Sequence, residues 1–159
     1  MFTKGADSDN LSEAKILVTW DKRYFTGIEL IDNQHRELVY LTNQLYQACL
    51  SGDKAAGDTF NDAMHRMVEY VRFHFGAEQG ILERVRYPML STHKLLHDKL
   101  IKQILDTVKD YKEGKRFVPN QFVRTLKDWI FGHIAVHDRY YAVYIADQRR
   151  KGLIPDSVS

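Results

Sequence analysis

The sequence predicts an all-α protein, an antiparallel up-down-up-down four-helix bundle with an extended N-terminal arm. Apolar residues recur at helical spacing in four long segments, and glycine or proline separates these segments by short connections. At 159 residues the chain is long enough for one domain with a buried core. Its hydrophobic fraction of 44% and charged fraction of 28% are ordinary for a soluble globular protein.

Each expected helix carries one apolar stripe, with apolar side chains three or four residues apart. Gly52, Pro88 and Gly114 interrupt the pattern between helices, and Pro119 suits the first turn of the last helix. The sequence therefore predicts helices over about residues 32–50, 55–84, 91–112 and 119–148.

The two ends of the chain lack this helical pattern. Residues 1–15 are polar and are expected to form a flexible arm, whereas the apolar and aromatic residues up to Ile28 suggest an ordered extended segment. The bundle domain is expected to cover residues 16–148. Residues 149–159 contain Gly152 and Pro155 and are expected to form an irregular tail.

Composition narrows the class of protein. The polar N-terminus lacks the apolar stretch of a signal peptide, and no run reaches the length of a membrane span, so we expect a cytoplasmic protein that does not enter a membrane. A net charge of +2 gives no reason to expect binding to nucleic acid. Cys49 is the single cysteine, which excludes an internal disulfide framework.

Histidines and carboxylates recur near helix ends. His93 and His97 are four residues apart, about 40° around a helix, so both can hold one metal from the same face. Because the start of one helix meets the end of the next in an up-down bundle, the groups on the other helices are expected at the same end. These groups are His35, His74 with Glu78, and His133 with His137 and Asp138.

Burying isolated histidines and carboxylates would cost several kcal/mol unless they were paired or bound to a metal, so their convergence favours a metal site. Imidazole suits iron, copper, zinc and nickel, and carboxylates can bridge two metals. Even five of these six histidines, together with two carboxylates, are too many ligands for one tetrahedral zinc and suit two metals.

Four segments of the sequence resemble the hemerythrins, specifically the bacterial ones, over about residues 20–144. Seven ligand positions match that family in type, order and spacing. The segments are Trp20 with Gly27-Ile28 and Ile31-Asp32-Asn33-Gln34-His35; His74-Phe75-Gly76-Ala77-Glu78; Tyr87-Pro88 with His93-Lys94-Leu95-Leu96-His97; and Trp129-Ile130-Phe131-Gly132-His133-Ile134 with Asp138.

The resemblance implies two iron ions in a non-haem, oxo- or hydroxo-bridged centre. One iron would be held by His93, His97 and His133. The other would be held by His35 and His74, leaving one open position for dioxygen. Glu78 and Asp138 would bridge the two ions. By the same resemblance a dry pocket would be lined by Leu38, Phe75, Trp129, Ile130, Ile134 and Val136.

The implied function is reversible dioxygen binding by an oxygen carrier, store or local supplier, with no enzymatic activity. Two other classes of function remain open: a di-iron oxidase or peroxidase, and a sensor module in which oxygen or iron changes a contact with a partner. A bundle whose histidines hold another metal is a further alternative. Ferritin-like di-iron enzymes use Glu-x-x-His pairs, which the implied ligand set lacks.

The spacing of the last two ligands conflicts with a regular helix. Asp138 follows His133 by five residues, which is about 140° around an α-helix, whereas His137 follows by four and would share the face of His133. Since the family pattern selects Asp138, we predict a π-bulge between His133 and Asp138. Gln79 and Leu82 stand where members of the family often carry glutamate and methionine.

Overall fold

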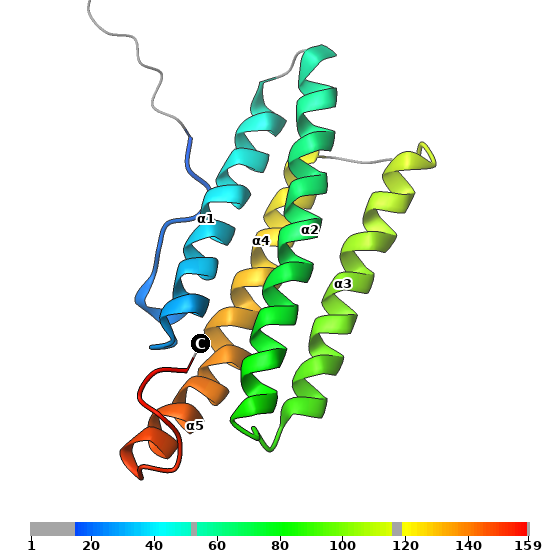
Figure 1. Cartoon of the computed structure of the whole chain (residues 1–159). Helices are drawn as coiled ribbons and strands as arrows, with labels where there is room; N and C mark the ends of the chain where they lie inside the picture. The colour runs from blue at the N-terminus through cyan, green and yellow to red at the C-terminus, as the bar shows by residue number, and fades with distance from the viewer. Residues whose placement is uncertain (1–14, 52–53, 116–118, 159) are drawn as a thin grey trace, which may run out of the picture.

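The computed structural model describes residues 15–51, 54–115 and 119–158, and all secondary-structure elements within those ranges are helices (Figure 1). The predicted up-down-up-down four-helix bundle is confirmed. Within the described ranges no helix is both long and apolar enough to cross a membrane. The elements are η1 (Lys22–Tyr24), α1 (Glu29–Leu50), α2 (Lys54–Arg84), α3 (Leu90–Lys112), α4 (Pro119–His133), η2 (Ile134–Asp138) and α5 (Arg139–Arg150).

The fourth helix of the bundle consists of α4, η2 and α5, which follow one another without a break. The element η2 is a π-helical turn, and it covers the five residues that end at Asp138. The π-bulge predicted from the spacing of His133 and Asp138 is therefore confirmed. The fourth helix of the bundle ends at Arg150, two residues beyond the predicted end at about residue 148.

The first helix begins earlier than expected, at Glu29 rather than near Asp32. Gly27 has a φ of +80°, which glycine adopts without strain and which turns the chain into the helix. The Asp32 carboxylate accepts hydrogen bonds from the Thr26 backbone at 2.7 Å, the Thr26 hydroxyl at 2.8 Å and the Gly27 backbone at 3.1 Å. Asp32 thus fixes the turn that precedes α1.

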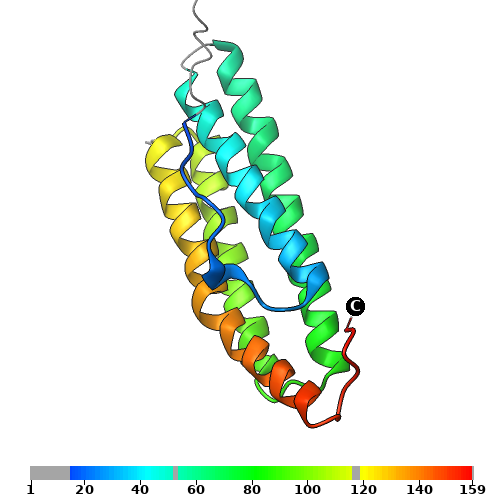
Figure 2. The same ribbon diagram turned by 90° about the vertical axis from the view of Figure 1, so that its left-hand side faces the viewer.

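The segment before α1 packs along the bundle, as Figure 2 shows for the blue chain that crosses α1 and α4. The Asn43 side chain accepts from the Val18 backbone nitrogen at 3.0 Å and donates to the Val18 carbonyl at 2.7 Å. The Tyr24 ring lies 4.9 Å from that of Phe131 on α4. The expectation of an ordered extended segment therefore holds for residues 16–28 except at η1, while residues 1–14 of the expected arm lie outside the described residues.

Two apolar clusters fill the bundle, one on each side of the predicted ligands. The larger contains Leu38, Phe75 and Ile130 and extends towards the far end. The smaller contains Ile31, Leu82 and their neighbours, and tail residues Ile154 and Val158 pack against it. The tail therefore covers the end of the bundle at which α1 and α3 begin (Figure 2).

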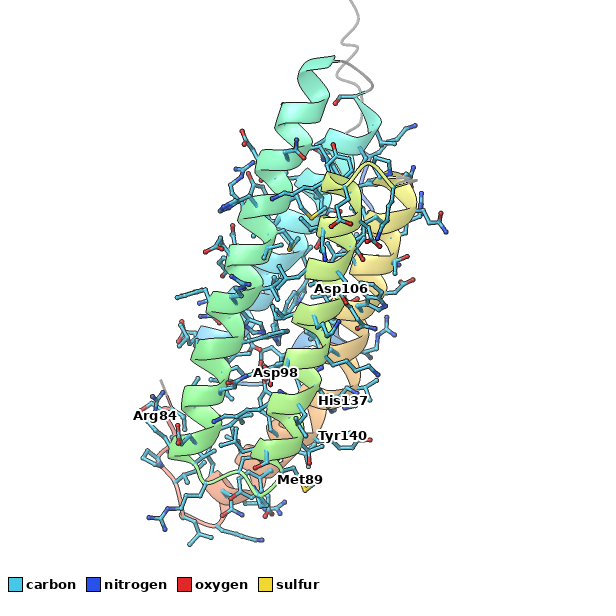
Figure 3. The ribbon with its side chains drawn as sticks, turned by 90° about the vertical axis from the view of Figure 1, so that its right-hand side faces the viewer. Arg84, Met89, Asp98, Asp106, His137 and Tyr140 are labelled. Atoms are coloured by element: carbon cyan, nitrogen blue, oxygen red, sulfur yellow. The ribbon has the colours of Figure 1, made fainter. Side chains whose placement is uncertain are left out.

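We expect Asp32→Ala to lower the free energy of unfolding by about 2–4 kcal/mol, because it leaves partly buried donors of Thr26 and Gly27 without their charged acceptor. The matched control is Asp106→Ala on α3, where the carboxylate is exposed and pairs with Lys102 (Figure 3). That change should cost less than about 1 kcal/mol. Urea unfolding of both variants measures the difference, and equal costs would contradict the role given to Asp32.

Candidate metal centre

Seven buried histidine and carboxylate side chains converge from all four helices of the bundle. The four helices supply them from the start of α1, the end of α2, the start of α3 and the region around η2, which lie at one end of the molecule (Figure 1). The most exposed of the seven is His133, at 8%. The side chains are His35, His74, Glu78, His93, His97, His133 and Asp138, the same seven that the sequence singled out.

Two of the histidines have their protonation fixed by outer contacts. His35 Nδ1 lies 2.7 Å from the Tyr24 carbonyl oxygen, and His74 Nδ1 lies 2.9 Å from Gln34 Oε1. Both partners are acceptors, so each Nδ1 must carry a proton and donate it. In a neutral imidazole the other nitrogen, Nε2, then has a bare lone pair.

These lone pairs face carboxylate oxygens. His35 Nε2 is 3.4 Å from Asp138 Oδ2, and His74 Nε2 is 3.3 Å from Glu78 Oε2, yet none of the four atoms has a hydrogen-bond partner. Acceptors that face one another in a buried site are stabilised only by a proton or a cation between them. Imidazole with carboxylate is a donor set that first-row transition metals favour, so the residues fit a metal ion.

A second group lies beside the first and contains three histidines. His133 Nε2 is 3.0 Å from His97 Nε2 and 3.0 Å from Asp138 Oδ1. His93 Nε2 makes a close contact with Glu78 Oε1. The three imidazoles therefore direct their Nε2 atoms at one point between them and the two carboxylates.

Both carboxylates belong to both groups. One group consists of His35, His74, Glu78 and Asp138, and in each group the potential ligand atoms lie within 4.8 Å of one another. The other consists of Glu78, Asp138 and the three remaining histidines. Because each carboxylate offers one oxygen to each side, the arrangement permits two cations that share two bridging ligands.

The π-helical turn decides which side chain of the fourth helix faces the cluster. Asp138 is fully buried there, whereas His137 is half-buried, its ring 6.4 Å from that of Tyr140. Figure 3 places His137 and the exposed Tyr140 on the outer side of the fourth helix next to α3. The extra residue in the turn therefore brings Asp138 onto the face of His133 and leaves His137 outside the cluster.

Contacts within the cluster and burial shift the pKa values of its side chains. Burial alone would raise the pKa of Glu78, but contacts with His74, His93 and His97 hold that pKa well below its ordinary value. Burial would lower the pKa values of His35 and His133, but the Asp138 carboxylate raises both. Burial lowers the pKa of His97. Both carboxylates are therefore anionic at neutral pH, and protons compete with metal for some of the imidazoles.

Most of the residues expected to line a dry pocket lie against the cluster. Phe75 stacks on the His97 ring with centroids 3.6 Å apart, and it packs in the same apolar cluster as Leu38, Ile130 and Ile134. Trp129 is only partly buried and lines an open hollow beside His133 and His137. Val136 is 50% exposed, so the structure does not place it inside the expected pocket.

The contacts that several residues make around the ligands were not predicted from the sequence. Gln34 and the Tyr24 carbonyl hold two histidines, and Gln79 contacts a third. Tyr141 is fully buried beside His93, with ring centroids 5.5 Å apart. A glutamine next to His35 was the available signal for Gln34, whereas no local pattern marks a backbone carbonyl eleven residues away.

Residues 26–144 match the model of the hemerythrin HHE cation binding domain. The chain belongs to the hemerythrin family. This match includes every residue of the two ligand groups.

Relatives and solved structures agree with the family. A bacteriohemerythrin of Clostridium acetobutylicum is 33% identical over 131 residues, covering 79% of this chain and 98% of its own length. One from Stenotrophomonas maltophilia is 29% identical over 126 residues, covering 79% and 80% respectively. The crystal structure of a wild-type hemerythrin superposes with a TM-score of 0.71 at 27% identity, covering 79% of this chain and 95% of that one.

We expect Asp138→Ala to weaken binding of divalent metal by at least about tenfold, because it removes an anionic group that both ligand groups share. His137→Ala, one residue earlier, should leave the affinity within about twofold, because that ring lies outside the cluster. Calorimetric titration with cobalt or zinc compares the two variants. The reverse order would contradict the arrangement around η2.

Metal affinity should rise with pH through and somewhat above the ordinary histidine range of about 6.5, because Asp138 raises the pKa values of His35 and His133. A raised pKa means that each ring keeps its proton to higher pH, and the metal must displace that proton. Titration at pH 7 in buffers of different ionisation enthalpy should therefore report proton release. Binding without proton release would contradict this prediction.

Proposed function

We propose that this hemerythrin-family chain binds dioxygen reversibly at a centre of two iron ions and serves as an oxygen carrier, store or local supplier. The observation that carries the proposal is the sharing of Glu78 and Asp138 between a two-histidine group and a three-histidine group. Two bridging carboxylates with unequal numbers of imidazoles suit a pair of similar metals with different numbers of open positions.

In this proposal His93, His97 and His133 hold one iron, and His35 and His74 hold the other. Glu78 and Asp138 would be shared by the two groups. When bound, two ferrous ions would supply the two electrons that dioxygen takes up and returns. The group of His35 and His74 offers one imidazole fewer than the other group, so it would leave room for dioxygen on that side.

The surrounding side chains favour return of dioxygen over further chemistry. Leu38, Ile130 and Ile134 are buried on the side of the larger apolar cluster, and they keep water and its protons away from the bound ligand. Phe75 covers one face of His97 and holds that ring in place. These residues line the proposed pocket, with Trp129 at its edge.

We propose that the protein is not an enzyme. Among the described residues, the two ligand groups contain histidine, aspartate and glutamate, without a serine, cysteine or lysine that would act as a nucleophile. Five imidazoles also make the site less anionic than a carboxylate-rich centre, which disfavours high oxidation states of iron.

The test begins with protein loaded with two ferrous ions per chain under nitrogen. On admission of air we expect a visible ligand-to-metal absorption band, and the band should disappear when oxygen is removed. Rapid irreversible oxidation with substrate turnover would support a di-iron oxidase or peroxidase instead. Absence of the band in iron-loaded protein would overturn the proposal.

His74→Ala should abolish the band or reduce it at least about tenfold, because it removes one of two imidazoles from the iron that binds dioxygen. His65→Ala is the matched control, since His65 lies on the same helix but is exposed and outside both ligand groups. The control should keep the band, and an unchanged band in His74→Ala would contradict the ligand assignment. Iron content and far-ultraviolet circular dichroism are measured on both variants.

A further inference from the structure

Gln79 contacts the proposed ligand His97, and this contact differs from those that the Tyr24 carbonyl and Gln34 make with their histidines. Its amide nitrogen Nε2 lies 2.9 Å from His97 Nδ1. At His35 and His74 the atom facing Nδ1 is an oxygen, which accepts a hydrogen bond. At His97 it is a donor, so Nδ1 must be the acceptor of that hydrogen bond.

A neutral imidazole with a bare Nδ1 carries its proton on Nε2. His97 Nε2 lies 3.5 Å from Glu78 Oε1, and the low pKa of that carboxyl keeps the oxygen ready to accept. His97 Nε2 also lies 3.0 Å from His133 Nε2, and the contacts of His97 with Gln79 and Glu78 fit the form with the proton on Nε2. A metal bound at Nε2 requires the opposite form, with the proton on Nδ1 and an acceptor facing it.

The His97 ring itself is held in place. Phe75 lies parallel to it with centroids 3.6 Å apart, and His93 meets it edge to face with centroids 4.5 Å apart. His97 is 1% exposed, so its ring is enclosed by these neighbours. Only the position of the proton and the orientation of the Gln79 amide remain to change.

We propose that Gln79 is a positioning residue that accompanies a tautomer exchange at His97 when metal binds. The proton moves from Nε2 to Nδ1, and the half-buried Gln79 amide turns over so that its oxygen accepts a hydrogen bond from the Nδ1–H group. The net number of protons is unchanged. Since His97 enters as a metal ligand, this proposal rests on the proposed function.

Gln79 and Gln34 therefore differ in role although both are amides. Gln34 Oε1 already faces His74 Nδ1, so His74 has the metal-binding form before metal arrives. Glutamine at position 79 serves both forms of His97, because its amide can present either a donor or an acceptor. A glutamate there would accept only, and a leucine would do neither.

The test measures the position of the ring proton directly, by long-range ¹H–¹⁵N correlation spectra of the histidine side chains. The full chain is studied without metal and with zinc, which is diamagnetic and does not react with dioxygen. For His97 we expect the proton on Nε2 without metal and on Nδ1 with zinc. For His74, the internal reference, we expect it on Nδ1 in both samples.

Two substitutions separate the donor and acceptor roles. Gln79→Glu should place the His97 proton on Nδ1 even without metal and should raise zinc affinity about tenfold. Gln79→Leu should lower zinc affinity about 10–100-fold. Gln44→Leu on α1 is the control, because the Gln44 amide contacts Tyr40 on its own helix, and its zinc affinity should stay within about twofold.

The outcomes distinguish this proposal from the proposed function. A His97 proton on Nδ1 in the metal-free protein, or equal zinc affinity in Gln79→Leu and the unaltered chain, would overturn the tautomer exchange alone. If zinc left both His97 nitrogens unchanged, His97 would not be a ligand and both proposals would fail. Tautomer exchange in a protein that shows no dioxygen band would support this proposal and overturn the other.

Discussion

Two hydrogen bonds to Nδ1 atoms determine what the centre of this bundle can hold. The Tyr24 carbonyl oxygen and Gln34 Oε1 each accept a hydrogen bond from the Nδ1–H group of a buried histidine. The Nε2 lone pairs of His35 and His74 are thereby directed at carboxylates that carry negative charge at neutral pH. Without a cation these atoms would repel one another inside an apolar interior. The metal site is therefore a consequence of the contacts outside it.

The fold keeps those outer contacts in place. The segment before α1 brings the Tyr24 carbonyl to His35, and the Tyr24 ring packs against Phe131 of α4. Asp32 closes the turn through which this segment enters α1. On the other side of the ligands, Ile154 of the tail packs against the smaller apolar cluster. Segments outside the four helices thus help to hold the ligand geometry in place.

The sequence predicted the architecture and the ligand cluster because both depend on periodic or local spacing. Apolar periodicity predicted the four helices, and the resemblance to the hemerythrins, which selects Asp138 five residues after His133, predicted the π-helical turn. The contacts of Gln34 and Gln79 were missed, because each joins residues on different helices and no sequence spacing indicates such a contact. The exposure of Val136 was also missed, because a wider turn changes the direction in which every residue within it points.

The π-helical turn also sets the charge of the centre. In a regular helix His137 would face the cluster on the side of His133, and Asp138 would lie about 140° around the helix from His133. The cluster would then have six imidazoles and one carboxylate, with a single group able to join the two sides. Two cations that close together repel each other, and one anionic carboxylate between them would offset less of that repulsion than two carboxylates do. One extra residue in the turn therefore supplies both a second carboxylate shared by the two groups and the negative charge that the proposed pair of metal ions requires.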